Sequence, residues 1–131
     1  MKLSQENVLK LEHPNEYSCI VFHYRVNHST LLVQARPKNP GHLKSFYIAF
    51  DGVEYYEGPF VWGSANVSIA TDDEFKDFLT KLGLPDLDLY LKYNRLFIIE
   101  QAIVNIKFIA VPSFTKMENL SREFAWLKSK S

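Results

Sequence analysis

The chain has 131 residues, the length of one ordinary domain, and we expect residues 1–131 to form a single domain. Fifteen basic residues balance fifteen acidic ones, so the chain lacks the positive surface that binding to nucleic acid or to an anionic membrane normally needs. Its first residues lack the continuous apolar stretch of a signal peptide, and no apolar run reaches membrane-spanning length. We therefore expect a cytoplasmic protein with neither a nucleic-acid nor a membrane partner.

Cofactor and metal motifs are missing from the sequence. The single cysteine, Cys19, excludes an intrachain disulfide and a cysteine-rich zinc site, and its strand-like surroundings predict a small buried side chain. The four histidines include no helical His-x-x-x-His pair, and there is no phosphate-binding glycine loop or nucleotide fingerprint. We expect no metal and no cofactor.

Residues 17–26 and 30–38 both alternate between two faces, which is the pattern of a β-hairpin. A two-residue loop between them would place Tyr24 opposite Val33, apolar against apolar. A slip of one residue would move apolar side chains to the other face, so we predict this register. It also brings polar side chains together on the second face: His23, Arg25, Gln34 and Arg36.

Asp51-Gly52 is a strong signal for a tight hairpin turn, because both positions of such a turn need positive φ. We predict that it joins residues 45–50 to residues 53–57. In this hairpin Tyr47 and Tyr56 share one face, opposite the apolar side chains that include Phe46, Ile48 and Phe50. Because both faces then carry large rings, either the sheet is covered on both sides or the tyrosines are exposed or line a cavity.

Residues 65–70 alternate as another strand, and Thr71-x-x-Glu74 has the pattern of a capping box that starts a helix. Apolar residues at helical spacing continue to Leu82, and Gly83 suits a left-handed helix end. Residues 86–94 fit either a strand, by alternation, or a helix, by charge order; we choose the helix.

Residues 95–101 and 103–111 are rich in branched side chains and predict two strands, although a single long bent strand remains an alternative. Thr115-x-x-Glu118 matches a second capping box and predicts a closing helix. Trp126 either widens the apolar stripe by which this helix would be buried or contacts a partner chain. The stripe consists of Met117, Leu120, Phe124 and Leu127.

Strands joined by short turns, with the helices grouped later in the chain, predict an α+β fold. We expect an antiparallel sheet of about six to seven strands built from hairpins, with two or three helices packed on one face. The sheet either stays open or curls into a half-barrel with an internal pocket.

Most carboxylates are explained by turns and helix starts, so no catalytic acid pair stands out. Aromatic surface remains, and tyrosine is favoured in ligand pockets and interfaces. We therefore favour a non-catalytic module that binds a small molecule or a protein segment. The expected binding residues are Tyr47, Tyr56, Phe60, Trp62, His23, Arg25 and Arg36.

Other interpretations stay open. Phe60 and Trp62 could instead seal the edge of the core, and the polar face of the first hairpin could simply be solvated. A small enzyme would use His23 as acid or base, assisted by Arg25, Arg36 or Glu54. A structural subunit would form a homo-oligomer through the closing helix or through an unpaired strand edge.

Overall fold

The computed structural model describes residues 7–25, 29–39, 41 and 43–119. Within these residues the chain forms an α+β domain with nine strands and two α-helices, which confirms the predicted class. In chain order the elements are η1 (Pro14–Glu16), β1 (Tyr17–Arg25), β2 (Thr30–Pro37), β3 (Phe46–Phe50), β4 (Tyr55–Glu57), β5 (Val61–Trp62), β6 (Val67–Ile69), α1 (Asp72–Leu82), α2 (Leu87–Tyr93), β7 (Arg95–Ile99), β8 (Ile106–Ala110) and β9 (Phe114–Met117).

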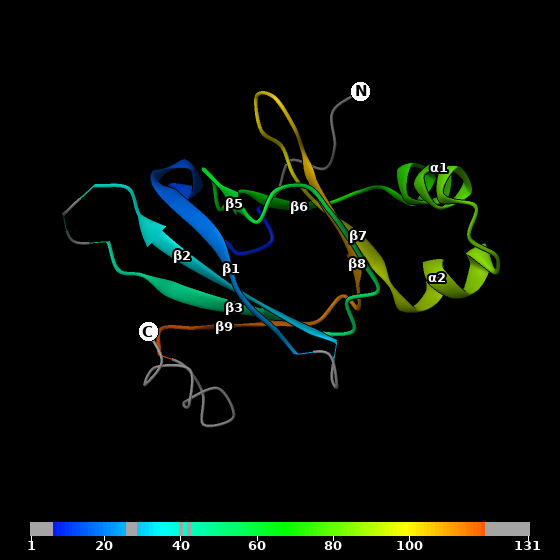
Figure 1. Cartoon of the computed structure of the whole chain (residues 1–131), viewed down its shortest axis with the longest axis horizontal. Helices are drawn as coiled ribbons and strands as arrows, with labels where there is room; N and C mark the ends of the chain where they lie inside the picture. The colour runs from blue at the N-terminus through cyan, green and yellow to red at the C-terminus, as the bar shows by residue number, and fades with distance from the viewer. Residues whose placement is uncertain (1–6, 26–28, 40, 42, 120–131) are drawn as a thin grey trace.

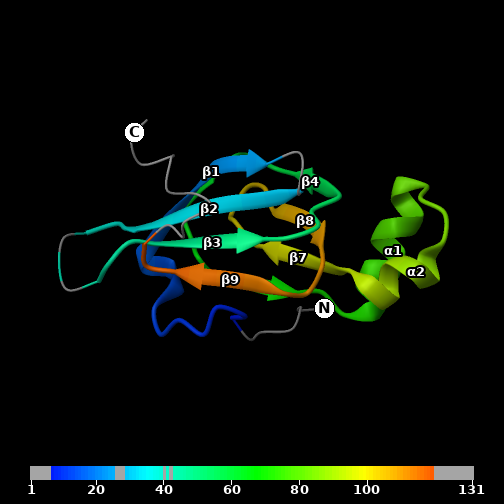
Figure 2. The same cartoon turned by 90° about the horizontal axis from the view of Figure 1, so that it is seen from below.

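The strands form two antiparallel sheets where the sequence predicted one. Sheet A has the strand order β5-β1-β2-β3-β9, and sheet B has the order β4-β8-β7-β6 (Figures 1 and 2). The inner faces of the two sheets enclose the main hydrophobic core, and neither sheet closes into a barrel. Both helices pack on the outer face of sheet B, through a second cluster that includes Phe75 and Leu79 of α1 and Leu96 and Ile98 of β7.

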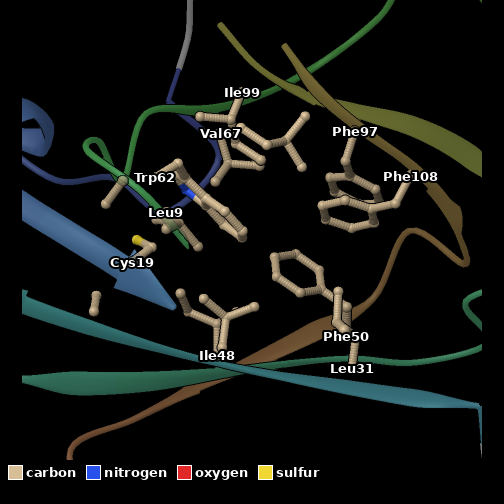
Figure 3. Packing of buried hydrophobic residues seen from close by; sticks show 14 of the residues in the cluster. Leu9, Cys19, Leu31, Ile48, Phe50, Trp62, Val67, Phe97, Ile99 and Phe108 are labelled. Atoms are coloured by element: carbon tan, nitrogen blue, oxygen red, sulfur yellow. The ribbon is translucent and has the colours of Figure 1, made fainter. Parts of the chain in front are cut away.

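Aromatic rings join the two sheets at the centre of the core. Phe50 of β3 points across to Phe97 and Phe108 of sheet B (Figure 3), with ring centroids 5.4 and 4.8 Å away in edge-to-face geometry. Trp62 and Cys19 fill another part of the same core. Alternation along each strand sends these side chains inward, and their burial supplies most of the driving force for the sandwich.

The pairing of β1 with β2 differs from the predicted register. Tyr24 lies opposite Leu31 and not opposite Val33, because the pairing begins at Arg25 and Thr30 and the connection is therefore longer than two residues. An irregularity between Val21 and His23 shifts the register again. A bulge places an extra residue in one strand, so the alternation that predicted the register is interrupted there. Residues 26–28, which include most of the predicted loop, lie outside the described residues.

The predicted hairpin at Asp51-Gly52 is wrong. β3 pairs with β2 and β9 in sheet A, whereas β4 pairs with β8 in sheet B, so the turn carries the chain from one sheet to the other. Gly52 does adopt the positive φ that the dipeptide indicated, at 60°. The corner is held by backbone hydrogen bonds from Val53 N to Ser29 O and from Val111 N to Asp51 O. An Asp-Gly dipeptide therefore fixed the local turn without fixing which strands it joins.

Local signals later in the chain are confirmed. Thr71 and Glu74 form the capping box of α1, and Gly83 ends that helix with φ 74°. Residues 87–93 are helical, as chosen over a strand. β7 and β8 are separate antiparallel neighbours, so the single bent strand is excluded.

The predicted start of a closing helix is also wrong. Phe114–Met117 forms β9, which pairs with β3 at the edge of sheet A (Figure 2), so Thr115 and Glu118 do not cap a helix. Pairing with an available sheet edge has overridden the local capping pattern. The remainder of the predicted helix, residues 120–131 with Trp126, lies outside the described residues. Among the helices that the structure describes, none combines the length and apolar character needed to cross a membrane.

Candidate functional site

A hollow of about 440 Å³ opens where the part of β1 beyond its short pairing with β5 faces β4, an edge strand of sheet B. Figure 2 shows β1 and β4 along the same margin of the molecule. After β4 the chain turns at Gly58, whose φ is 120°, and Val21 N of β1 then donates to the carbonyl oxygen of Phe60 at 2.8 Å. The hollow is lined by Val21, Tyr24, Leu31, Val53, Glu54, Tyr55, Tyr56 and Phe60.

Four aromatic rings run nearly parallel from the mouth of this hollow into the core. Phe60 is 63% exposed and stacks on Tyr56, with ring centroids 5.4 Å apart and planes 8° apart. Tyr56 is followed by Phe108 at 6.1 Å and 15°, and Phe108 by Phe97 at 5.2 Å and 13°. Phe97 and Phe108 are fully buried. The exposed wall of the hollow is thus backed by the packed centre of the sandwich.

Two of the three tyrosine hydroxyls of the hollow donate to backbone carbonyls, and the third, that of Tyr55, donates to Glu57. Tyr56 Oη donates to Pro59 O at 2.6 Å, and Tyr24 Oη donates to Val53 O at 3.3 Å. Burial raises the pKa of Tyr56 well above its ordinary value, so this side chain stays uncharged even in moderately alkaline solution. Fixed hydroxyls leave the ring faces as the surface offered to a ligand.

Glu54 is the one charged side chain among the residues that line the hollow. It also lies against α2: burial, together with the charge and a hydrogen bond of Glu54, raises the pKa of Tyr90. No lysine, arginine or histidine occurs in the lining within the described part of the chain. The site is therefore aromatic and apolar, with a single negative charge.

Two of the predicted binding residues, Tyr56 and Phe60, lie together in this hollow. Tyr47 does not share a face with Tyr56, because β3 and β4 belong to different sheets; it contacts Phe22 on the outer face of sheet A, with ring centroids 5.5 Å apart. Trp62 is 5% exposed and belongs to the core. The alternative that Trp62 seals the core describes its position better than a binding lip does.

The polar residues of the first hairpin lie on the side of sheet A away from the hollow. His23 is opposite Leu32, which points to the outer face. Arg36 Nε donates to Gln34 Oε1 at 3.1 Å, and Gln34 Nε2 donates to Tyr47 Oη at 3.3 Å.

Arg25 ends β1 opposite Thr30, and its side chain lies outside the described part of the structure. The polar cluster and the aromatic hollow are therefore separate surfaces, although both were expected to contribute to one site.

Sequence reasoning missed Tyr24, Val21, Val53 and Glu54 as members of the hollow. Tyr24 was assigned to the same face as Phe22, but Phe22 lies on the outer face, and the irregularity after Val21 places Tyr24 on the inner face. Its position at the mouth of the hollow was not expected, because the prediction paired β4, which faces Tyr24, with β3 in the wrong sheet. No local signal in the sequence indicates that β1 and β4 would belong to two different sheets and face each other.

A second hollow, of about 540 Å³, lies between α1 and sheet B and is rich in charge. Its carboxylates already have partners: Asp77 pairs with Lys81 at 3.2 Å, Glu57 accepts from Tyr55 Oη at 2.8 Å, and Glu74 belongs to the capping box. Within the described residues, no three histidine, cysteine, aspartate or glutamate side chains gather as a metal site. We therefore do not place a function there.

Cys19 is 2% exposed, and burial raises the pKa of its thiol to about 12, an effect that the Trp62 side chain partly offsets. Because the pKa is raised, the reactive thiolate at pH 8 is roughly a thousandfold rarer than in the unfolded chain. We expect a disulfide reagent to leave the native protein unmodified for hours at pH 8 and to label one thiol within minutes in denaturant. Rapid labelling of the native protein would contradict the buried position of Cys19.

Comparison with known proteins yields no match to a family model, to a curated protein or to a solved structure.

Proposed function

We propose that this chain is a non-catalytic binding module that holds a small, largely apolar molecule in the hollow between β1 and β4. The observation that carries the proposal is the aromatic wall of this hollow, where exposed Phe60 and half-buried Tyr56 stack in front of a rigid core. Its volume of about 440 Å³ falls within the ~300–1,000 Å³ that small-molecule sites occupy.

The distribution of ionisable groups supports binding over catalysis. General acid–base chemistry needs positioned groups that exchange protons near neutral pH, and this usually involves more than one such group. The hollow has one carboxylate, Glu54, and three tyrosines: the hydroxyls of Tyr24 and Tyr56 donate to backbone carbonyls, and that of Tyr55 donates to Glu57. His23, the base of the enzyme alternative, lies on the opposite face of sheet A.

Phe60→Ala tests this proposal because it removes an exposed ring from the mouth of the hollow. We expect the native protein to raise the fluorescence of Nile red, a neutral apolar dye, in a saturable manner. Phe60→Ala should weaken the binding about three- to tenfold, the effect of losing one aromatic contact. The melting temperature should change by only a few degrees because Phe60 is largely exposed.

Tyr93→Ala provides the matched control. Tyr93 is 56% exposed on α2 and does not line the hollow. This variant should bind the dye as the native protein does. If the two variants bind equally well, or if the native protein shows no saturable binding, the hollow is not the binding site proposed here.

A further inference from the structure

We infer that the ligand of the β1–β4 hollow is a small organic cation that carries an alkylated ammonium group. This inference rests on the proposed function and specifies the chemistry of the same site. It follows from two features of the hollow taken together: exposed aromatic faces and a negative charge that no described cationic side chain in the lining balances.

The exposed rings of Tyr24 and Phe60, the second of which is stacked on Tyr56, provide the first feature. Aromatic faces carry partial negative charge and attract a cation that lies within about 6 Å of the ring centre. The hydroxyls of Tyr24 and Tyr56 donate to backbone carbonyls, so the rings are held in place by the chain itself. A ligand cation would therefore meet aromatic faces that need little reorganisation.

The same chain uses lysine side chains to cover other aromatic rings. Lys116 lies 4.9 Å from the centre of the Phe46 ring, and Lys107 lies 5.3 Å from that of Phe78. Among the described side chains, no lysine or arginine lies over Tyr24, Tyr56 or Phe60 in this way. Tyr56 is stacked between Phe60 and Phe108, so the exposed rings of Tyr24 and Phe60 are the ones that remain open to a cation supplied from outside.

Glu54 provides the second feature and decides the sign of the ligand charge. An anionic ligand would face this carboxylate without a basic residue in the described lining to offset the repulsion. A neutral ligand would gain burial but no attraction from Glu54, whose exposed carboxylate also interacts with Tyr90. A cation gains attraction from Glu54 and from the ring faces together.

The scarcity of acceptors favours an alkylated ammonium group over a primary one. A primary ammonium carries three donors that need acceptors when it leaves water. The charged or polar side-chain groups in the lining are one carboxylate and the phenol oxygens of its tyrosines. Alkylation removes ammonium donors and adds apolar surface that the rings can cover.

Phenyltrimethylammonium and its uncharged isostere tert-butylbenzene form a pair of probes with the same shape. We expect the cation to bind the full chain about tenfold more tightly than the isostere, as measured by NMR titration. Resonances of Val21, Tyr24 and Phe60 should shift together. Phenylacetate, an anionic probe, should show no binding at the same concentrations.

Glu54→Gln separates the charge from the shape of the site. This variant should weaken the binding of phenyltrimethylammonium about three- to tenfold and leave the affinity for tert-butylbenzene unchanged. Asp88→Asn, which removes an exposed carboxylate of α2 outside the lining, should change neither affinity. Circular dichroism and melting curves establish that each variant is folded.

The outcomes distinguish the inference from the proposed function. If tert-butylbenzene binds in the hollow as tightly as the cation, or if Glu54→Gln leaves the cation affinity unchanged, the inference of a cationic ligand is wrong and the binding function stands. If neither probe nor Nile red shifts the resonances of the lining residues, both are wrong.

Discussion

Replacing Phe108 with alanine is expected to lower the free energy of unfolding by about 3–5 kcal/mol. Phe108 is fully buried and its ring contacts Phe50, Phe97 and Tyr56, with centroids between 4.8 and 6.1 Å away. Its removal leaves a cavity where sheets A and B meet, and neighbouring rings fixed on opposite sheets can collapse into it only in part. The midpoint of urea unfolding should fall while its slope stays the same.

Phe60→Ala is the control for this experiment, because it shortens the same row of rings at its exposed end. With 63% of its surface in solvent, Phe60 should contribute within about 0.5 kcal/mol to stability. Equal losses in the two variants would contradict the separation between an exposed binding wall and a buried core. A loss below about 1 kcal/mol for Phe108→Ala would show that the sheets do not depend on this ring.

Local sequence signals predicted those parts of the fold that depend on neighbouring residues. Thr71, Glu74 and Gly83 specify α1 because each makes its contact within one or two turns of the helix. Alternation identified β1, β2 and β3 because the period of two is a property of the strand itself. The class of the fold and most elements could therefore be predicted.

Pairing between distant segments could not be predicted in the same way. The positive φ of Gly52 suits a hairpin and a corner between sheets equally well, and hydrogen bonds to Ser29 and Val111 decide between them. At residues 114–117 the free edge of β3 decides in favour of a strand. In both cases the deciding partner is far away in the sequence, and local preference carries no information about it.

The site was predicted only in part, because some of its residues are brought together by distant segments of the chain. Tyr56 and Phe60 were expected together because they are four residues apart around Gly58-Pro59, and the structure stacks their rings. Tyr47 was included in the expected site because the predicted hairpin, which is wrong, placed it on the same face as Tyr56. Tyr24 and Glu54 were missed as hollow residues because membership depends on how strands of the two sheets face each other. Their contribution to binding remains a prediction.

Trp62→Ala is the second variant expected to have a large effect, about 3–5 kcal/mol of unfolding free energy. As the lip of a binding surface, Trp62 would tolerate this change with little loss of stability. The structure changes that expectation: the side chain is 5% exposed, lies in the main core near Cys19 (Figure 3), and its strand pairs with β1. Thermal and urea unfolding should both show the loss.

Two further variants separate the causes of this effect. Val61→Ala alters the exposed neighbour in β5 and should change stability by about 0.5 kcal/mol or less. Trp62→Phe keeps a large ring but removes the indole N–H, which is buried with no oxygen or nitrogen acceptor among the described residues and interacts only weakly with the thiol of Cys19. Because removing an unsatisfied donor relieves its desolvation penalty of ~1–3 kcal/mol, Trp62→Phe should lose much less than Trp62→Ala. If Trp62→Ala instead retains full stability and loses dye binding, the indole belongs to the ligand site and the boundary drawn here between core and hollow is wrong.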